Sequence, residues 1–274
     1  MGSKVSKAKV STENRPIPTK TKPVTVPRIP QDIIDEILDH LASDSDFGSL
    51  RACALVSKSS VQPCRRHLFR TVVFNSTHMD RWLKTFPVPE ESPAHHVKDL
   101  RICVGGDSRV HERFFKHTRW FTGAHRMYLA GYGGRPLFQE TQNWTLPQSV
   151  TSLAIDTGVM TLVHVRDIMA QLPNLGDLTL SGSLVAVDGR ELLGIGTVLK
   201  GRFAGQLILS SECVGRGAID MLLEIPTGLH FTEVRICCTR EHLPSAVRLV
   251  EACYKTLVKL SHTVTIPCKS NLFS

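Results

Sequence analysis

Histidine and cysteine are two residue types that can bind a metal ion or act as a nucleophile, and this sequence has twelve histidines and eight cysteines. Five histidines fall in one region of the chain, at His95, His96, His111, His117 and His125. Their spacing from cysteines and carboxylates fits no metal-ligand pattern, so we expect them on a solvated surface. The eight cysteines include no C-x-x-C pair. These residues therefore predict neither a metal site nor a cofactor.

Other motifs that carry catalytic chemistry are also missing from the sequence. There is no G-x-S-x-G elbow, no Walker A loop and no H-E-x-x-H, since His111-Glu112 is followed by Arg-Phe-Phe. The glycine-rich stretches 131–135 and 194–201 could be phosphate-binding loops, but isolated glycines are more typical of turns. We therefore expect a protein that is not an enzyme.

The positive charge of the chain is concentrated at its start. The formal net charge is +8, and seven basic residues against one acidic residue in positions 1–28 give this leader +6 of it. The remainder, at +2, lacks the broad basic face that nucleic acids require, so no nucleic acid is expected as a partner. The leader is rich in proline and without helical or strand periodicity, so we expect it to be disordered.

Cysteine usage and the N-terminal residues indicate a compartment. Irregularly spaced cysteines, and no secretory hydrophobic region in the first 28 residues, predict reduced thiols in the cytoplasm, the nucleus or both. No apolar run reaches the ~18 residues of a membrane span. Met-Gly-x-x-x-Ser at the start matches the pattern for N-myristoylation at Gly2. A membrane is a partner only if Gly2 is acylated; the alternative is an unmodified, solvated tail.

The segment that follows the leader has the pattern of an amphipathic helix. Pro30 stands at its start and acidic residues lie in its first turns, where both are favoured. Its apolar residues recur as one helical stripe, at Ile33, Ile34, Ile37, Leu38 and Leu41. Two further helical runs, over 49–57 and 62–70, precede the strand-like T-V-V-F. Such a small unit needs a neighbour or a partner for stability.

Three pieces of this unit together resemble the F-box, as it occurs in fungal F-box proteins. They are I-P-x-x-I-I-x-E-I-L-x-x-L, L-R-A-C-A-L-V-S-K-S and C-R-R-H-L-F, within 29–69. The resemblance implies docking on the Skp-family adaptor of a cullin-RING ubiquitin ligase. The adaptor-binding residues that it implies are Ile29, Pro30, Ile33, Ile34, Ile37, Leu55, Val56 and Ser57. Ser60 stands where the family often has tryptophan.

An apolar-x-x-apolar-x-apolar phrase recurs along the rest of the chain. Its copies end 25 to 29 residues apart, at Ile102, Leu129, Ile155, Leu180, Leu209, Ile236 and, in a weaker copy, His262. The alternation at the end of each phrase predicts a short strand, and helix-like runs lie between the phrases. A strand and a helix at this period resemble the leucine-rich repeat, although the Asn or Cys expected three residues after each phrase is missing.

These resemblances imply an α/β fold in four parts: the disordered leader 1–28, an all-α F-box unit over 29–70, an irregular leucine-rich-repeat horseshoe over 71–264, and a tail over 265–274. Parallel strands would line the concave side and helices the convex side. Strand residues between the buried ones would face the concave side, the usual binding surface. The target-binding residues expected there are Arg101, Tyr128, Thr179, Ile208 and Arg235.

The function implied is that of a non-catalytic substrate-recognition adaptor of an SCF-type ubiquitin ligase, which holds an unknown protein target on its repeats. The alternative is a leucine-rich-repeat interaction scaffold without a ligase role, tethered to membranes if Gly2 is myristoylated. For any single residue of the concave side, a solvated position with no binding role is a further alternative.

Overall fold

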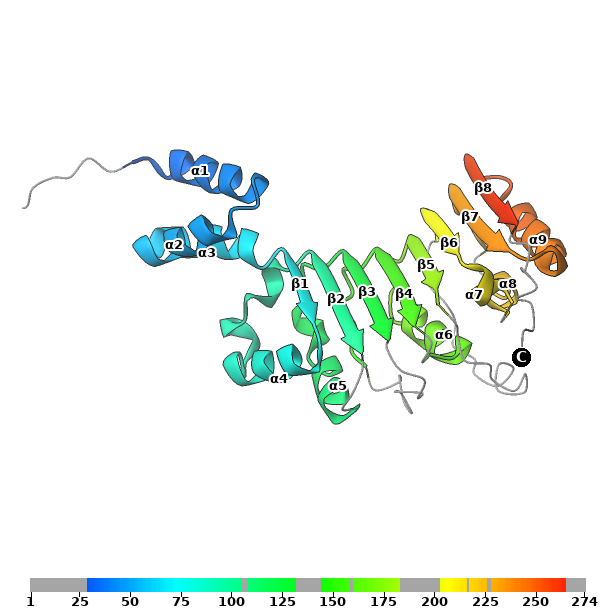
Figure 1. Cartoon of the computed structure of the whole chain (residues 1–274), viewed down its shortest axis with the longest axis horizontal. Helices are drawn as coiled ribbons and strands as arrows, with labels where there is room; N and C mark the ends of the chain where they lie inside the picture. Colours follow the sequence, from blue (N-terminus) through cyan, green and yellow to red (C-terminus); the bar gives the residue numbers. More distant parts are fainter. Residues whose placement is uncertain are drawn as a thin grey trace, which may run out of the picture.

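The computed structural model gives a mixed α/β fold with one parallel sheet (Figure 1). It describes residues 29–104, 108–131, 144–157, 160–182, 203–215, 217–225 and 228–264. The leader with Gly2, the tail 265–274, the glycine-rich stretch 194–201 and all but the first residue of the glycine-rich stretch 131–135 lie outside these residues. None of the helices in the described ranges combines the length and apolar composition needed to cross a bilayer.

Three helices at the N-terminal end form a separate unit. They are α1 (Gln31–Ser43), α2 (Phe47–Val56) and α3 (Lys58–Leu68). Pro30 directly precedes α1, and Asp46 begins α2 by accepting a hydrogen bond from the Ser49 amide at 3.0 Å. Ser57 both ends α2 and caps α3, so α3 begins four residues before the helical run predicted from Gln62.

Eight strands lie side by side in the order in which they occur in the chain. They are β1 (Thr71–Phe74), β2 (Asp99–Val104), β3 (Arg126–Gly131), β4 (Ser152–Thr157), β5 (Asp177–Ser181), β6 (Gln206–Leu209), β7 (Glu233–Cys238) and β8 (Lys259–Val264). All seven neighbouring pairs are parallel. The phrases found in the sequence are thus strands of one sheet, and T-V-V-F is its first strand.

Helices connect many of the described strands. The α-helices are α4 (Ser76–Thr85), α5 (Ser108–Phe115), α6 (Leu162–Ala170), α7 (Ser211–Val214), α8 (Ala218–Leu223) and α9 (Leu243–Cys253). Short 3-10 turns are η1 (Pro89–Glu91), η2 (Pro93–His96), η3 (Thr118–Trp120) and η5 (Arg240–His242). In Figure 1, α4, α5 and α6 lie on one side of the sheet, and no helix of the described residues is drawn on its other side between α1–α3 and β6–β8.

The strand register places the apolar residues of each phrase in two continuous buried rows. The first row contains Leu100, Met127, Leu153, Leu178, Leu207 and Val234. The second contains Ile102, Leu129, Ile155, Leu180, Leu209 and Ile236. Side chains alternate between the two faces of a strand, so these rows build the core and leave the intervening residues on the opposite face. The helical unit has its own small core around Leu38, Leu50 and Cys64.

A repeated backbone contact fixes where each strand begins. One carbonyl before a strand accepts hydrogen bonds from two successive amides of the next strand: Lys98 and Asp99, for example, donate to the Arg70 carbonyl at 2.8 and 3.0 Å. The accepting residues are Arg70, Lys98, His125, Thr151, Gly205 and Thr232. Between β5 and β6 the pattern changes, because the Gln206 amide donates to the Asp177 side chain at 2.7 Å instead.

Candidate functional site

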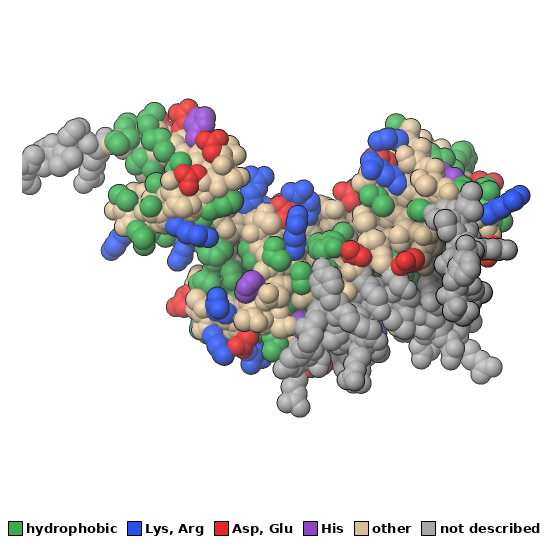
Figure 2. All heavy atoms as spheres, viewed as in Figure 1, with side chains coloured by type: hydrophobic (Ala, Val, Ile, Leu, Met, Phe, Trp, Pro, Cys, Tyr) green, Lys and Arg blue, Asp and Glu red, His purple; other side chains and the backbone are tan. Residues whose placement is uncertain are grey.

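Large apolar side chains are exposed on one side of the helical unit. Leu55 and Val56, at the end of α2, are 89% and 82% exposed. Ile29, directly before Pro30, and Ile33 and Ile37, in the N-terminal half of α1, are also exposed. The start of α1 and the end of α2 lie at the end of the unit remote from the sheet (Figure 1), and Figure 2 shows hydrophobic side chains gathered there. We call these five residues the apolar surface.

The wide apolar stripe of α1 serves two faces of that helix. Leu38 is buried in the helical core, and Ile34 and Leu41 pack against it. Ile33 and Ile37 are one helical turn apart and lie on a different side of the helix, where they remain exposed. The core of this unit therefore accounts for three of the five residues of the stripe and leaves Ile33 and Ile37 exposed.

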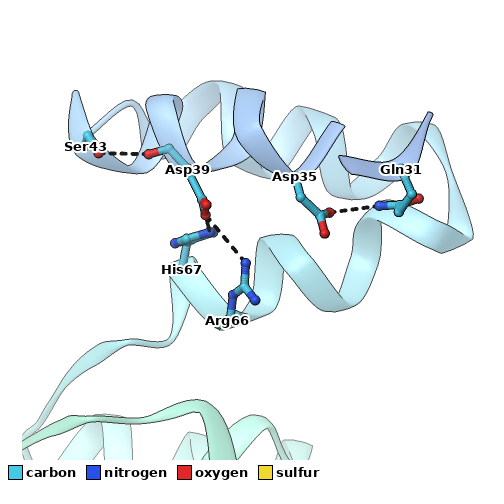
Figure 3. A network of polar contacts seen from close by, with 6 residues as sticks. All are labelled: Gln31, Asp35, Asp39, Ser43, Arg66 and His67. Carbon is cyan, nitrogen blue, oxygen red and sulfur yellow. Dashed lines mark hydrogen bonds and ion pairs between the residues drawn. The ribbon is translucent and has the colours of Figure 1, made fainter. Parts of the chain in front are cut away.

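Polar contacts of one carboxylate link α1 to α3 (Figure 3). The Asp39 carboxylate lies 2.8 Å from Nε2 of His67 and 3.5 Å from Nη2 of Arg66. Asp35 instead accepts a hydrogen bond from Gln31 within α1 itself, at 2.9 Å. Asp39 thus adds a polar contact to the apolar core that positions α1.

The remaining residues predicted to bind the adaptor lie close to this surface but differ in exposure. Pro30 is exposed directly before α1, whereas Ile34 is half-buried against the helical core. Ser57 is half-buried, and its hydroxyl accepts a hydrogen bond from the Ser59 amide at 3.1 Å, so it works as a cap. Ser60, where the resemblance expects tryptophan, is buried inside the unit at 6% exposure.

The predicted target-binding residues all lie in one row across the sheet. Strand register aligns Val73, Arg101, Tyr128, Ala154, Thr179, Ile208, Arg235 and Ser261. We call this the central row. Its side chains are exposed or half-buried, in contrast to the buried rows that flank it. Arg101 and Tyr128 are direct neighbours in this row, whereas Arg235 lies several strands away on β7.

Charged residues on this face form ion pairs, both between neighbouring strands and within one strand. Arg126 on β3 donates to Asp99 on β2, with Nη2 2.9 Å from Oδ2. On β7, Glu233 holds both Arg235 at 2.8 Å and Lys259 of β8 at 3.0 Å. Hydrogen bonds from Lys259 and Arg235 hold the pKa of Glu233 below its ordinary value, which keeps this carboxylate ionised.

A pocket of about 380 Å³ opens on this face over β2, β3 and β4. It is lined by Asp99, Leu100, Arg101, Arg126, Met127, Tyr128, Ser152 and Ala154. The Tyr128 hydroxyl donates to Asp156 Oδ2 at 3.1 Å, which orients its ring. We call this the β2–β3 pocket.

A second, larger pocket lies between the helical unit and β1. Its volume is about 580 Å³, and Phe47, Arg51 and Arg70 are among its lining residues. Sequence reasoning missed these residues, because only the packing of α1 to α3 beside the first strand brings them together. The paired Asp39 and His67 lie in the same wall.

No group of three or more His, Cys, Asp or Glu in the described ranges is placed to hold a metal ion. Cys238 Sγ lies 3.3 Å from Nε2 of His262, but the thiol is fully buried, and that burial raises its pKa and favours the unreactive neutral form. The solvated position expected for all five histidines is wrong for His111, which is 1% exposed.

Comparisons with known proteins found no relative of this chain. No protein-family model, no curated protein and no solved structure matches the chain.

Proposed function

We propose that the chain is a non-catalytic substrate-recognition adaptor of an SCF-type ubiquitin ligase. In this proposal α1–α3 are an F-box that docks on the Skp-family adaptor, and the sheet with its helices is an irregular leucine-rich-repeat horseshoe that holds a protein target. Ubiquitin transfer would then be accelerated by raising the effective concentration of the target near the ligase, with no chemistry in this chain.

The observation that carries this proposal is the apolar surface. Burying a large aliphatic side chain contributes about 1.5–3 kcal/mol, so five such side chains left exposed in one small unit favour a protein partner there. They are five of the residues for which the F-box resemblance implies adaptor contact. The repeated strand phrase, and strands that follow one another in chain order, support the second half of the proposal.

Co-purification with the Skp-family adaptor tests the proposal. The wild-type chain should bind, and the double substitution Ile33→Ala with Leu55→Ala should weaken binding by at least about tenfold, since a loss of 1.4 kcal/mol corresponds to tenfold. Pro30→Ala with Ile33→Ala should act in the same direction. Both altered side chains of the first pair are exposed, so circular dichroism should show an intact fold.

Asp32→Asn is the matched control, because Asp32 is exposed on α1 but is not part of the apolar surface. It should leave adaptor binding unchanged within about threefold. A wild-type chain that does not bind the adaptor would reject the ligase role. The alternative, an interaction scaffold tethered through an acylated Gly2, is tested by measuring the mass of the N-terminal peptide.

A further inference from the structure

Arg101 stands apart among the basic side chains of the β2–β3 pocket. It is exposed in the middle of β2, and within the described part of the chain no acidic side chain forms an ion pair with it. Arg126, the second arginine of the pocket, is paired with Asp99. Among the described residues that line the pocket, Asp99 is the one carboxylate and it is paired with Arg126, so one positive charge of this lining, that of Arg101, has no acidic partner.

The equivalent residues of β7, Glu233 and Arg235, show why Arg101 on β2 lacks an acidic partner among the described residues. Asp99 and Arg101 on β2 occupy the same two rows as Glu233 and Arg235 on β7, in each case two residues apart on one face. On β7 the longer Glu233 side chain reaches Arg235 at 2.8 Å while it also holds Lys259. On β2 the shorter Asp99 turns to Arg126 and accepts a weaker contact from Thr71 at 3.4 Å. The same sequence spacing thus satisfies one arginine and leaves the other free.

The surroundings of Arg101 suit a side chain that ends in an anionic group. Its neighbour in the central row is Tyr128, whose ring is oriented by the hydrogen bond to Asp156. The next position is Ala154, which leaves space beside that ring within the pocket. A guanidinium group binds carboxylate or phosphate through two parallel hydrogen bonds, and an adjacent aromatic ring packs against an aliphatic stem.

From this arrangement we infer that the β2–β3 pocket binds an acidic segment of the target protein, with one carboxylate or phosphate group on Arg101 and the neighbouring part of the segment on Tyr128. The inference rests on the target-binding half of the proposed function. A nucleic acid does not suit this pocket, because binding a phosphate backbone requires several unpaired basic side chains. On the described part of this face, Arg126 and Arg235 are both paired with acidic residues.

Degenerate peptide pools bound to the full-length chain test this inference. The pools share flanking composition and differ in one fixed central residue, which is glutamate, phosphoserine, glutamine or serine. We expect wild type to retain the glutamate or the phosphoserine pool at least about fivefold over its neutral counterpart, as charge-assisted hydrogen bonds exceed neutral ones. Retention of one pool and not the other identifies the anion as carboxylate or phosphate.

Arg101→Gln should reduce retention of the anionic pools to that of the neutral pools. Arg248→Gln is the matched control, because it removes the same charge from an exposed arginine of α9 that is already paired with Asp220 and lies outside the central row. It should change retention by less than about twofold. Equal retention of all pools by wild type, or equal losses in the two variants, would overturn the inference.

The readouts separate this inference from the ligase role. Adaptor co-purification reports on α1–α3, whereas peptide retention reports on β2 and β3. A chain that prefers anionic pools but binds no Skp-family adaptor retains the pocket assignment and loses the ligase role. A chain that binds the adaptor but shows no preference among the pools loses the pocket assignment alone.

Discussion

At the scale of single residues, the Asp177 side chain takes the place of a backbone carbonyl as the hydrogen-bond acceptor at one strand entry. Elsewhere in the sheet, a carbonyl before each strand accepts two amides of the next strand, as the Gly205 carbonyl does for Thr232 and Glu233. At the entry to β6 the Gly176 carbonyl accepts only the Gly205 amide, and Asp177 Oδ1 accepts the Gln206 amide at 2.7 Å. Gly205 has no side chain, and a Cβ atom there would overlap Asp177 Oδ1.

This arrangement predicts different results for two substitutions of Asp177. Asp177→Ala leaves the half-buried Gln206 amide without its acceptor and should lower the free energy of unfolding by about 1–3 kcal/mol. Asp177→Asn keeps an oxygen acceptor and should cost less than half as much. Urea denaturation measures both. Equal costs for the two substitutions would mean that the carboxylate charge, and not the hydrogen bond, matters here.

The sequence predicts which residues lie on the sheet face that carries the central row, but not which charged side chains pair with each other there. Arg101, Tyr128 and Arg235 can be assigned to one row because the phrase repeats with a regular alternation. The partner of each charged side chain depends on the register between strands and on side-chain length. Glu233 reaches Arg235, whereas Asp99 pairs with Arg126 across the strands, and no pattern in one phrase distinguishes these outcomes.

At the scale of elements, α1 is held by a small core and by one polar contact. The helical core contains only three fully buried apolar residues, Leu38, Leu50 and Cys64. Asp39 adds the contact with Arg66 and His67 of α3. The orientation of the apolar surface therefore depends on Asp39 more than it would in a unit with a large core.

We expect Asp39→Asn to loosen α1 without unfolding the sheet. An exposed ion pair contributes at most about 1 kcal/mol, so exchange of the α1 amides with solvent should become faster by up to about fivefold, while β2–β5 exchange as in wild type. Asp35→Asn is the control, since Asp35 contacts only Gln31 of its own helix among the described residues. It should change α1 exchange less than Asp39→Asn does. Hydrogen exchange followed by mass spectrometry distinguishes the two.

Most elements of the sheet are predictable from the sequence, and the exceptions have physical reasons. The strands after β1 follow from the phrase, and α6 and α8 lie within the helix-like runs 161–172 and 218–225 of the sequence, whereas α9 begins two residues before the run 245–257. The helix α4 was not predicted, because its buried residues Met79 and Trp82 are too few to establish a period. The backbone carbonyls that order the strand entries leave no trace in the side-chain pattern, so the sequence does not reveal them.

At the scale of the whole molecule, the helical unit and the sheet have separate apolar cores. Polar contacts join them: η2 packs against α3, where His96 Nε2 lies 3.2 Å from Oε1 of Gln62. Burial, together with the charges of His95 and of basic residues on α3, lowers the pKa of His96 below its ordinary value of 6.5. The folded protein therefore favours the neutral imidazole at this junction.

The sign of this shift predicts loss of stability in acid. As the pH falls, His96 binds a proton in the unfolded chain before it does so in the folded protein. The contribution of neutral His96 to the free energy of unfolding is therefore present above pH 6.5 and is lost as the pH falls through the pKa of His96 in the folded protein. From about pH 7.5 to about pH 5.5, wild type should lose more thermal stability than His96→Gln. His40→Gln, at an exposed position of α1, should follow wild type. An equal loss in all three proteins would contradict the assignment to His96.

Strand order has a mechanical consequence. Each strand is hydrogen-bonded only to the strands before and after it in the chain. A force that pulls β1 and β8 apart therefore acts on every pairing of neighbouring strands, and we call each such pairing a seam of the sheet. The weakest seam, and not the sum of all of them, then sets the resistance to extension. That seam is β5–β6, where only three residue pairs are in register and the backbone entry contact is replaced by a side chain. Under tension, the sheet should part there into two blocks.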